Sequence, residues 1–327
     1  MNKLRIALLA GGWSSERDVS IKSGNAVFQA LNKEKYIVHK YDPKDNLRDL
    51  FDNKGNIDLA FILLHGKNGE DGRIQALLDL LKIPYVGSGM LSSAITMNKY
   101  ITKKLYRKAD IVAPKEIILK NMDNVSLIMI RETLGQKVIV KPLTQGSSIG
   151  MSFCNNDEKL ISGLAKAFQY DKEIMIEEYI NGREISCCVI GGHELQALPL
   201  IEIIPKNPIG LFDYKAKYIK GASSEICPAK IDYVLTNKIK KIAIKAHQIL
   251  GLRVWSRTDL IIKNDNIYTL ETNTIPGMTS NSLFPLAAKT AGISFPNLLD
   301  QLILISCNYY GNHSAISRML VSDTQQV

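Results

Sequence analysis

The stretch RTDLIIKNDNIYTLETNTIPGMTSNS, residues 257 to 282, decides the fold of the C-terminal part of the chain. Two short apolar runs, 258–262 and 267–271, have the residue types of β-strands. The segment Asn264-Asp265-Asn266 between them is typical of a turn. The stretch therefore predicts a β-hairpin.

This hairpin brings three oxygen-bearing side chains together. With a three-residue loop, Lys263 pairs with Ile267, and Asp259 lies directly opposite Glu271. A two-residue loop makes the two carboxylates diagonal neighbours, still within reach of each other. Strand alternation places Asn273 on the same face as Glu271. We expect all three side chains to converge at one end of the hairpin.

A bound cation would explain this cluster, because carboxylates held so close repel each other. Oxygen ligands at this spacing suit Mg²⁺, whose remaining ligands are usually phosphates and water. Arg257 adds a fixed positive charge, and the loop 274–282 offers backbone N–H groups to an anion. Together these features indicate phosphoryl transfer. A solvated hairpin end is the alternative interpretation.

The string LETNTIPGMTSNS, residues 270 to 282, resembles the C-terminal signature of D-alanine–D-alanine ligases, members of the ATP-grasp superfamily. Further matches extend the resemblance toward residue 305. It implies an enzyme that uses ATP to join two D-alanines through an acyl phosphate, for peptidoglycan precursor synthesis. It also implies an α/β fold of ATP-grasp architecture, in which an N-terminal open parallel-sheet domain precedes two α+β subdomains that clamp ATP.

The composition fits a soluble, cytoplasmic protein. The chain has 327 residues, 46% of them hydrophobic, and no apolar run near the roughly 18 residues that span a bilayer. Its apolar start stops at Gly11-Gly12, which favours a β-strand over a signal peptide. Five cysteines without C-x-x-C spacing fit a reducing compartment. We expect no membrane partner.

The formal net charge of +9 admits either a nucleic acid or an anionic small molecule. Lys and Arg are spread along the chain without a known nucleic-acid motif. A nucleotide also suits a basic protein. We therefore expect no nucleic-acid partner.

The N-terminal part alternates strands with helices. Strands are expected at 4–10, 36–41 and 59–64, and helices near 20–31 and 74–81, which is typical of an open α/β sheet. Ligands of such sheets lie beyond the carboxyl ends of the strands. Residues 65–72 follow the third strand and occupy that position.

Two N-terminal strings resemble the ligase family. Glu16, in GGWSSERDVS, matches the glutamate that holds the ammonium of the first D-alanine. A helix-capping role at the surface is the alternative for Glu16. The string HGKNGEDG, residues 65–72, matches the family loop beside the same substrate, which assigns His65 and Glu70 to that site.

The central part of the chain carries lysines that suit a nucleotide. Lysines on a helix mostly face water, and we expect this of Lys103 and Lys104 on the helix 92–110. The resemblance instead places Lys99 of this helix near the nucleotide phosphates. It likewise assigns Lys141, at the end of a strand over 138–142, to phosphate binding.

A glycine–serine loop at 143–151 offers N–H groups and hydroxyls to phosphates. The resemblance makes it part of a strand-loop-strand lid in which Ser147 helps to close the substrate site. Gln145 departs from the family, where many relatives carry a charged residue.

Acidic residues follow on the strands expected at 173–180 and 185–190. A charged hairpin with solvated carboxylates is the plain interpretation. The resemblance implies that Glu177 and the backbone of Glu178 to Ile180 bind adenine, and that Glu184 binds the ribose hydroxyls.

A polar, weakly patterned span from 205 to 228 is expected to be a functional loop. The resemblance assigns Lys217 to ATP phosphate and the substrate carboxylate, and Tyr218 to the active site. Helices are expected at 231–250, 283–291 and 296–307. We predict domains at 1–98, 99–184 and 185–307, followed by a disordered tail at 308–327.

The resemblance completes the expected chemistry. It implies that Asp259, Glu271 and Asn273 hold two Mg²⁺ or Mn²⁺ ions. Arg257 and the N–H of Gly277 stabilise the tetrahedral oxyanion. Ser282 and Lys217 hold the carboxylate of the second substrate. Thr272 and Ser256 depart from the family pattern, in which small residues are usual.

Other interpretations remain open at this point. An ATP-grasp ligase could use another acceptor, D-lactate or D-serine. A non-catalytic nucleotide- or nucleic-acid-binding protein belongs to a different class. We also expect a homodimer.

Overall fold

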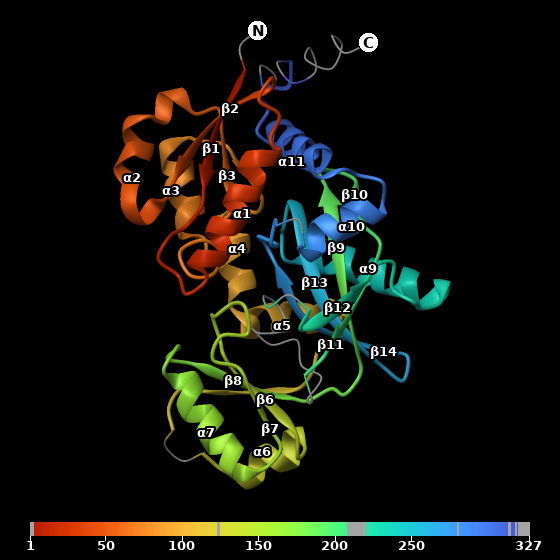
Figure 1. Ribbon diagram of the computed structural model, residues 1–327. Helices are drawn as coiled ribbons and strands as arrows, with labels where there is room; N and C mark the ends of the chain where they lie inside the picture. Colours follow the sequence, from red (N-terminus) through yellow and green to blue (C-terminus); the bar gives the residue numbers. More distant parts are fainter. Residues whose placement is uncertain are drawn as a thin grey trace.

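The computed structural model describes residues 3–122, 125–207, 219, 221–279, 281–312, 315–317 and 319. Three units lie around a common centre, and each is built on its own β-sheet (Figure 1). No helix within the described residues is both long and apolar enough to cross a membrane.

The N-terminal unit is an open parallel sheet with the strand order β2-β1-β3-β4. Strands β1 (Leu4–Leu9) and β3 (Leu59–Ile62) are apolar and almost wholly buried, as expected of strands covered on both faces. The other elements are β2 (Tyr36–Tyr41), β4 (Tyr85–Val86), α1 (Arg17–Ala30), α2 (Pro43–Asp52), the 3-10 helix η1 (Lys54–Asn56), α3 (Arg73–Leu81) and α4 (Met90–Met97). The predicted parallel α/β start is confirmed.

The helix expected at 92–110 is interrupted. Helix α4 ends at Met97, and α5 (Lys99–Lys108) begins after one intervening residue, Asn98. Asn98 between them is extended, and its side chain accepts hydrogen bonds from the backbone N–H groups of Tyr100 and Ile101. Asn98 is therefore the N-cap of a new helix, a role that asparagine favours.

The middle unit is an antiparallel sheet with the order β5-β8-β6-β7. Its elements are β5 (Glu116–Leu119), α6 (Leu127–Leu134), β6 (Val138–Pro142), β7 (Ser152–Cys154), α7 (Asp157–Phe168) and β8 (Ile174–Glu178). Alternation gives the sheet two different faces. Val138, Val140 and Ile176 pack on α6 and α7, whereas Lys141 and Glu177 line a pocket on the other face.

The C-terminal unit is a sheet with the order β12-β11-β9-β13-β14, with β10 beside β9. Its elements are β9 (Arg183–Gly191), β10 (Leu195–Ala197), β11 (Ile201–Pro205), β12 (Ser223–Ile226), α9 (Tyr233–Ile249), β13 (Val254–Lys263), β14 (Asn266–Asn273), α10 (Leu283–Thr290) and α11 (Phe295–Tyr309). Strand β12 lies inside the span expected to be a loop, because its pairing with β11 supplies order that its polar sequence does not indicate.

The hairpin β13–β14 has the shorter of the two predicted loop lengths. Lys263 pairs with Asn266, so the loop has two residues, and both Asn264 and Asp265 have positive φ, as the favoured two-residue turn requires. The register then shifts between Asp259 and Leu260, so that Asp259 faces Glu271 directly. Leu270 is the extra residue of a β-bulge, and if the pairing of Leu260 with Thr269 continued regularly, Asp259 would face Leu270 instead of Glu271.

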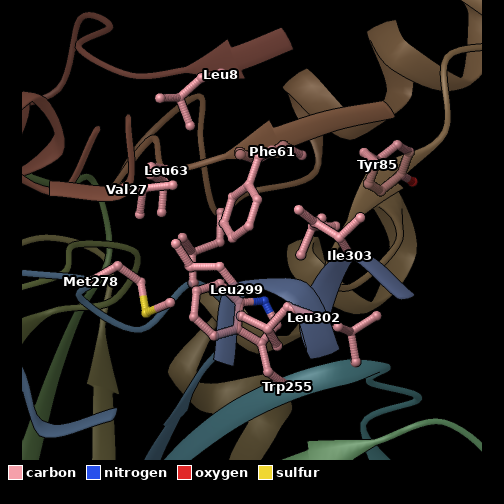
Figure 2. Close-up of a cluster of buried hydrophobic side chains, with 14 of the residues drawn as sticks. Leu8, Val27, Phe61, Leu63, Tyr85, Trp255, Met278, Leu299, Leu302 and Ile303 are labelled. Atoms are coloured by element: carbon pink, nitrogen blue, oxygen red, sulfur yellow. The ribbon is translucent and has the colours of Figure 1, made fainter. Parts of the chain in front are cut away.

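A shared hydrophobic core joins the N-terminal unit to the C-terminal one. Trp255 of β13 makes edge-to-face contacts with Phe61 of β3 and Phe284 of α10. Figure 2 shows this cluster, in which Leu299, Leu302 and Ile303 of α11 lie beside Trp255 and Phe61. The middle unit has a separate core. The predicted domain limits stay a prediction. The apolar core is shared between the first and the last of the predicted domains.

Part of the predicted tail packs on this same core. Ala315 and Met319 are buried and belong to the shared cluster. The expectation of a disordered tail therefore does not hold for these residues. Residues 320–327 lie outside the described part of the chain.

Replacing Trp255 with alanine tests the shared core. We expect Trp255→Ala to lower the free energy of unfolding by about 3–5 kcal/mol, because it removes a fully buried ring and leaves a cavity. Trp13, which is 49% exposed, supplies the control, and Trp13→Ala should change stability by less than about 0.5 kcal/mol. Chemical unfolding followed by circular dichroism measures both, and equal effects would contradict the assignment.

Candidate active site

A pocket lies between the middle sheet and the hairpin of the C-terminal sheet. Every residue that the sequence assigned to ATP, apart from Lys217, lines it: Lys99, Lys141, Glu177, Glu178, Ile180 and Glu184. Asp259 and Glu271 line the same pocket. The structure thus brings together nucleotide and metal candidates from five strands and one helix end. Lys217 and Tyr218 lie outside the described residues.

Two lysines hold the carboxylate of Glu177. Lys141 Nζ donates to Glu177 Oε2 at 2.8 Å, and Lys103 Nζ donates to Oε1. Burial alone would raise the pKa of Glu177, but the two ammonium groups outweigh it and the pKa lies below its usual value. Burial acts to lower the pKa of Lys141, yet Glu177 raises it overall. Glu177 and Lys141 are therefore both charged at neutral pH.

Lys103 corrects a prediction. Its side chain was expected to face water, but it is 0% exposed and also donates to the carbonyl of Pro114 at 2.8 Å. The acidic residues that neutralise it, Glu177 and Glu116, lie far away in the sequence, so helix periodicity does not reveal them. Lys104 is exposed, as expected.

The glycine–serine loop reaches from the pocket toward the N-terminal unit. Lys99 Nζ donates to the backbone carbonyl of Gln145 at 2.5 Å, and Thr144 donates twice to Asp171. Ser147 and Ser148 both have positive φ. This turn directs the Ser147 hydroxyl to the carboxylate of Glu16.

Backbone bonds fix the connection that follows β8. The N–H of Glu178 donates to the carbonyl of Lys115, and the N–H of Tyr179 donates to the carbonyl of Lys137. The side chain of Glu178 accepts from the N–H of Lys115. The strand edge assigned to adenine is thus held in an extended conformation beside Glu184.

Asp259 is the most heavily bonded group of the hairpin. Arg257 binds it through two parallel hydrogen bonds of 2.8 Å. Ser186 of β9 donates to Oδ1 at 2.5 Å, and the amide of Asn273 donates to Oδ2 at 3.1 Å. Burial tends to lower the pKa of Arg257, but Asp259 raises it above its ordinary value. Sequence reasoning missed Ser186, which only strand pairing reveals.

The hairpin can supply oxygen ligands to a small divalent cation. Asp259 and Glu271 face each other across the strands, and both line the pocket. Within the described residues, no group of three or more His, Cys, Asp or Glu side chains could hold a metal ion by itself. Two carboxylates and one amide fit Mg²⁺, which takes its remaining ligands from phosphates and water.

A second cluster lies where the N-terminal sheet meets the loop. Glu16 is 4% exposed, and its side chain makes no helix-capping hydrogen bond, which contradicts the surface-capping alternative. Gly66 and Gly146 lie against its carboxylate, and a Cβ added at Gly146 would be 2.6 Å from Oε2. Both positions need glycine because the carboxylate approaches the backbone this closely.

His65 and Glu70 complete this cluster. His65 Nε2 lies 3.2 Å from Ser23 Oγ, and burial lowers the pKa of His65 to about 4. Glu70 accepts from the N–H of Gly66 at 2.7 Å. Burial, with Glu16 nearby, raises the pKa of Glu70 to about 8. At neutral pH the imidazole is therefore uncharged and Glu70 largely protonated.

The loop that follows β14 places Gly277 and Ser282 beside each other. A Cβ added at Gly277 would be 3.0 Å from Ser282 Oγ. The Ser282 hydroxyl accepts from the N–H of Thr279 at 3.0 Å, and the N–H of Met278 points to Ser23 at 3.4 Å. The loop is thus fixed between α10 and α1.

Hydrogen bonds behind the hairpin involve Thr272 and Ser256, the two departures from the family pattern that lie on its strands. Tyr106 of α5 bonds to Thr272 at 2.6 Å, and Thr272 bonds to Thr258 at 2.9 Å. Ser256 lies 2.8 Å from His247 Nδ1 of α9. Each polar substitution is therefore satisfied by a buried partner on a covering helix.

Two antiparallel sheets that enclose a pocket lined by Lys99 and Lys141, next to an acidic hairpin, define an ATP-grasp protein. The family model for the C-terminus of D-Ala–D-Ala ligase matches residues 106–304, and that for the N-terminus matches residues 44–88. The chain belongs to the D-alanine–D-alanine ligase family.

Known proteins agree with this assignment. The chain is 50% identical to the D-alanine–D-alanine ligase of Syntrophobacter fumaroxidans over 92% of this chain and 97% of that one. The ligase of Bacillus anthracis, solved in complex with ATP, is 35% identical with a TM-score of 0.82, covering 95% and 99% of the two chains. The VanG D-Ala:D-Ser ligase of Enterococcus faecalis is 32% identical with a TM-score of 0.79, covering 93% and 100%.

Proposed function

We propose that the chain joins two D-alanines to D-alanyl-D-alanine at the expense of ATP, in the cytoplasm. The observation that carries the proposal is the position of Arg257 and Asp259. Asp259 lines the nucleotide pocket, while the charge of Arg257 acts on Glu70 and His65 in the second cluster. One ion pair thus connects a site for phosphates to a site for an amino acid. All five cysteines are free thiols, which suits a reducing compartment.

The first D-alanine binds in the second cluster. Its ammonium lies against Glu16 and Glu70, and the Ser147 hydroxyl, bonded to Glu16, closes the site from the glycine–serine loop. Its carboxylate then points toward the nucleotide and attacks the γ-phosphorus of ATP. The bond between the γ-phosphorus and the bridging oxygen breaks, ADP leaves, and the resulting acyl phosphate carries phosphate as a good leaving group in place of a poor one.

The second D-alanine attacks the acyl phosphate with its amine. The tetrahedral adduct carries a negative charge, which Arg257 and the N–H of Gly277 stabilise. Ser282 and Lys217 hold the carboxylate of this second substrate. Closure of the site excludes water, which would otherwise hydrolyse the acyl phosphate.

A divalent cation belongs to the proposed reaction. Asp259, Glu271 and Asn273 would hold Mg²⁺ or Mn²⁺, in two copies. When bound, the ions neutralise charge on the phosphates. Arg257 shares Asp259 with this site, so the same carboxylate orients the arginine.

The second substrate could instead be D-serine or D-lactate, and the similarity to VanG gives D-serine a specific basis. Release of ADP and phosphate with D-alanine alone, D-alanine plus D-serine, D-alanine plus D-lactate, and L-alanine distinguishes these functions. We expect turnover with D-alanine alone. ATP binding without any D-alanine-dependent ADP release would overturn the proposal.

Substitution of Arg257 tests its catalytic role. We expect Arg257→Ala to lower turnover by roughly 10²–10³-fold, the usual loss for one oxyanion donor, with little change in ATP affinity. Arg257→Lys is the matched variant, since it keeps the charge opposite Asp259 but cannot form both hydrogen bonds. Steady-state kinetics and ATP titration measure both variants. Unchanged turnover would remove Arg257 from the mechanism.

Binding of D-alanine should release a proton from Glu70. The pKa of Glu70 is about 8 in the free protein, so the group is mostly protonated at pH 7. The substrate ammonium favours the carboxylate and lowers this pKa, so a proton leaves on binding. Proton release should vanish well above pH 8, where Glu70 is already ionised, and in Glu70→Gln, which has no proton to lose. Calorimetry at pH 7 in buffers of different ionisation enthalpy measures it, and equal release by the variant would contradict the assignment.

We also propose a homodimer, supported by exposed apolar side chains on α3 and α4, which pack on each other. Leu80 is 82% exposed, Leu91 67% and Met90 46%. Leu80→Glu combined with Leu91→Glu should shift the protein to monomer in analytical ultracentrifugation. Ile161→Glu on α7, at a residue that is 50% exposed, should not. A double variant that stays dimeric would place the interface elsewhere.

A further inference from the structure

A row of alternating charges runs from the surface of α5 to the nucleotide pocket. Arg107 pairs with Glu116, and Glu116 Oε2 lies 3.7 Å from Lys103 Nζ. Lys103 pairs with Glu177, and Glu177 pairs with Lys141. Of these five groups, Glu177 and Lys141 line the pocket. Lys103 lies behind them and cannot touch a ligand there without displacing Glu177.

Burial of Lys103 is costly and therefore informative. Its side chain is 0% exposed, and lysine is almost never fully buried unless it is paired. It donates to the Pro114 carbonyl and to Glu177, and it has a second carboxylate, Glu116, nearby. Burial lowers the pKa of Lys103, and the two carboxylates oppose this effect. These partners suit the ammonium form.

The number of positive charges around Glu177 decides whether the charge of Lys141 is available to a phosphate. Lys141 and Glu177 alone would form a neutral pair, and a phosphate would compete with Glu177 for the same ammonium. Lys103 supplies a second positive charge to the opposite oxygen of that carboxylate. The group of Lys103, Glu177 and Lys141 then has a net charge of one positive unit, and its pocket-facing cation is Lys141.

We propose that Lys103 is a positioning residue for the nucleotide, one that neutralises and orients Glu177 so that the charge of Lys141 is available to the phosphates. The inference rests on the proposed function, because it takes the pocket to be the ATP site. It differs from a purely structural role, in which Lys103 only fastens α5 to the middle sheet. A structural role would affect every ligand of the pocket alike.

Binding of ATP, ADP and adenosine, which differ in their number of phosphates, distinguishes the positioning role from the purely structural role. In Lys103→Met, Glu177 remains paired with Lys141 and cancels its charge. We expect ATP and ADP to lose roughly tenfold more affinity for this variant than adenosine does, because adenosine has no phosphate but keeps the adenine that Glu177 would contact. Calorimetric titration of the full chain at constant Mg²⁺ gives the three affinities. Lys104→Met, on the exposed side of the same helix, is the matched control and should leave all three unchanged.

A double variant guards against misfolding. Lys103→Met combined with Glu177→Gln removes both members of the buried ion pair and leaves Lys141 with its full charge. The ratio of ATP to adenosine affinity should then return to within about threefold of the original. Circular dichroism confirms that each variant is folded. If Lys103→Met unfolds, the double variant alone tests the positioning role of Lys103. A ratio of ATP to adenosine affinity far below that of the unsubstituted protein would overturn it.

The outcomes separate this inference from the proposed function. Equal losses of ATP and adenosine affinity in Lys103→Met would overturn the positioning role while leaving the ligase intact. If the unsubstituted protein binds neither ATP nor ADP, the proposed function itself is overturned. A loss that is larger for ATP and ADP than for adenosine, reversed in the double variant, would support both.

Discussion

The paired hydrogen bonds between Arg257 and Asp259 are the interaction on which the arrangement of the site depends. Two residues on one face of β13 satisfy each other, while Ser186 and Asn273 from the neighbouring strands fill the remaining positions around the carboxylate. Burial of either charge alone would be costly, and each group offsets that cost for the other. The pair therefore fixes the point at which the nucleotide pocket meets the amino acid cluster.

Around this pair, the fold places its lysines toward one end of the site only. Lys99 and Lys141 lie on the nucleotide side, whereas Glu16 and Glu70 lie on the amino acid side. A phosphate and an ammonium are therefore attracted to different ends of one site. The shared core around Trp255 holds the N-terminal sheet against β13 and so keeps Glu16 and Glu70 at their distance from the hairpin.

Sequence alone predicted the parallel α/β start, the ATP-grasp class and the residues that the structure collects in one pocket. Three features escaped it, two of them because they depend on pairing between distant segments. The partners of Lys103 lie on strands of the middle sheet, and Ser186 reaches Asp259 only through the register of β9 with β13. The break at Asn98 competes with a helical pattern that continues on both sides. The roles of Lys217 and Tyr218 rest on resemblance, since they lie outside the described residues.

The bulge at Leu270 separates two requirements that a simple hairpin would couple. The turn at Asn264 and Asp265 needs residues that accept positive φ, but its chemistry has no part in the site. Because Leu270 is an extra residue, Glu271 instead of Leu270 lies opposite Asp259. Evolution can therefore exchange Asn264 and Asp265 for other residues that accept positive φ, such as glycine, without altering this pair. Loss of a single codon from residues 267 to 270 would remove the bulge and still leave Glu271 opposite Asp259, so the pairing of the two carboxylates tolerates a shorter strand.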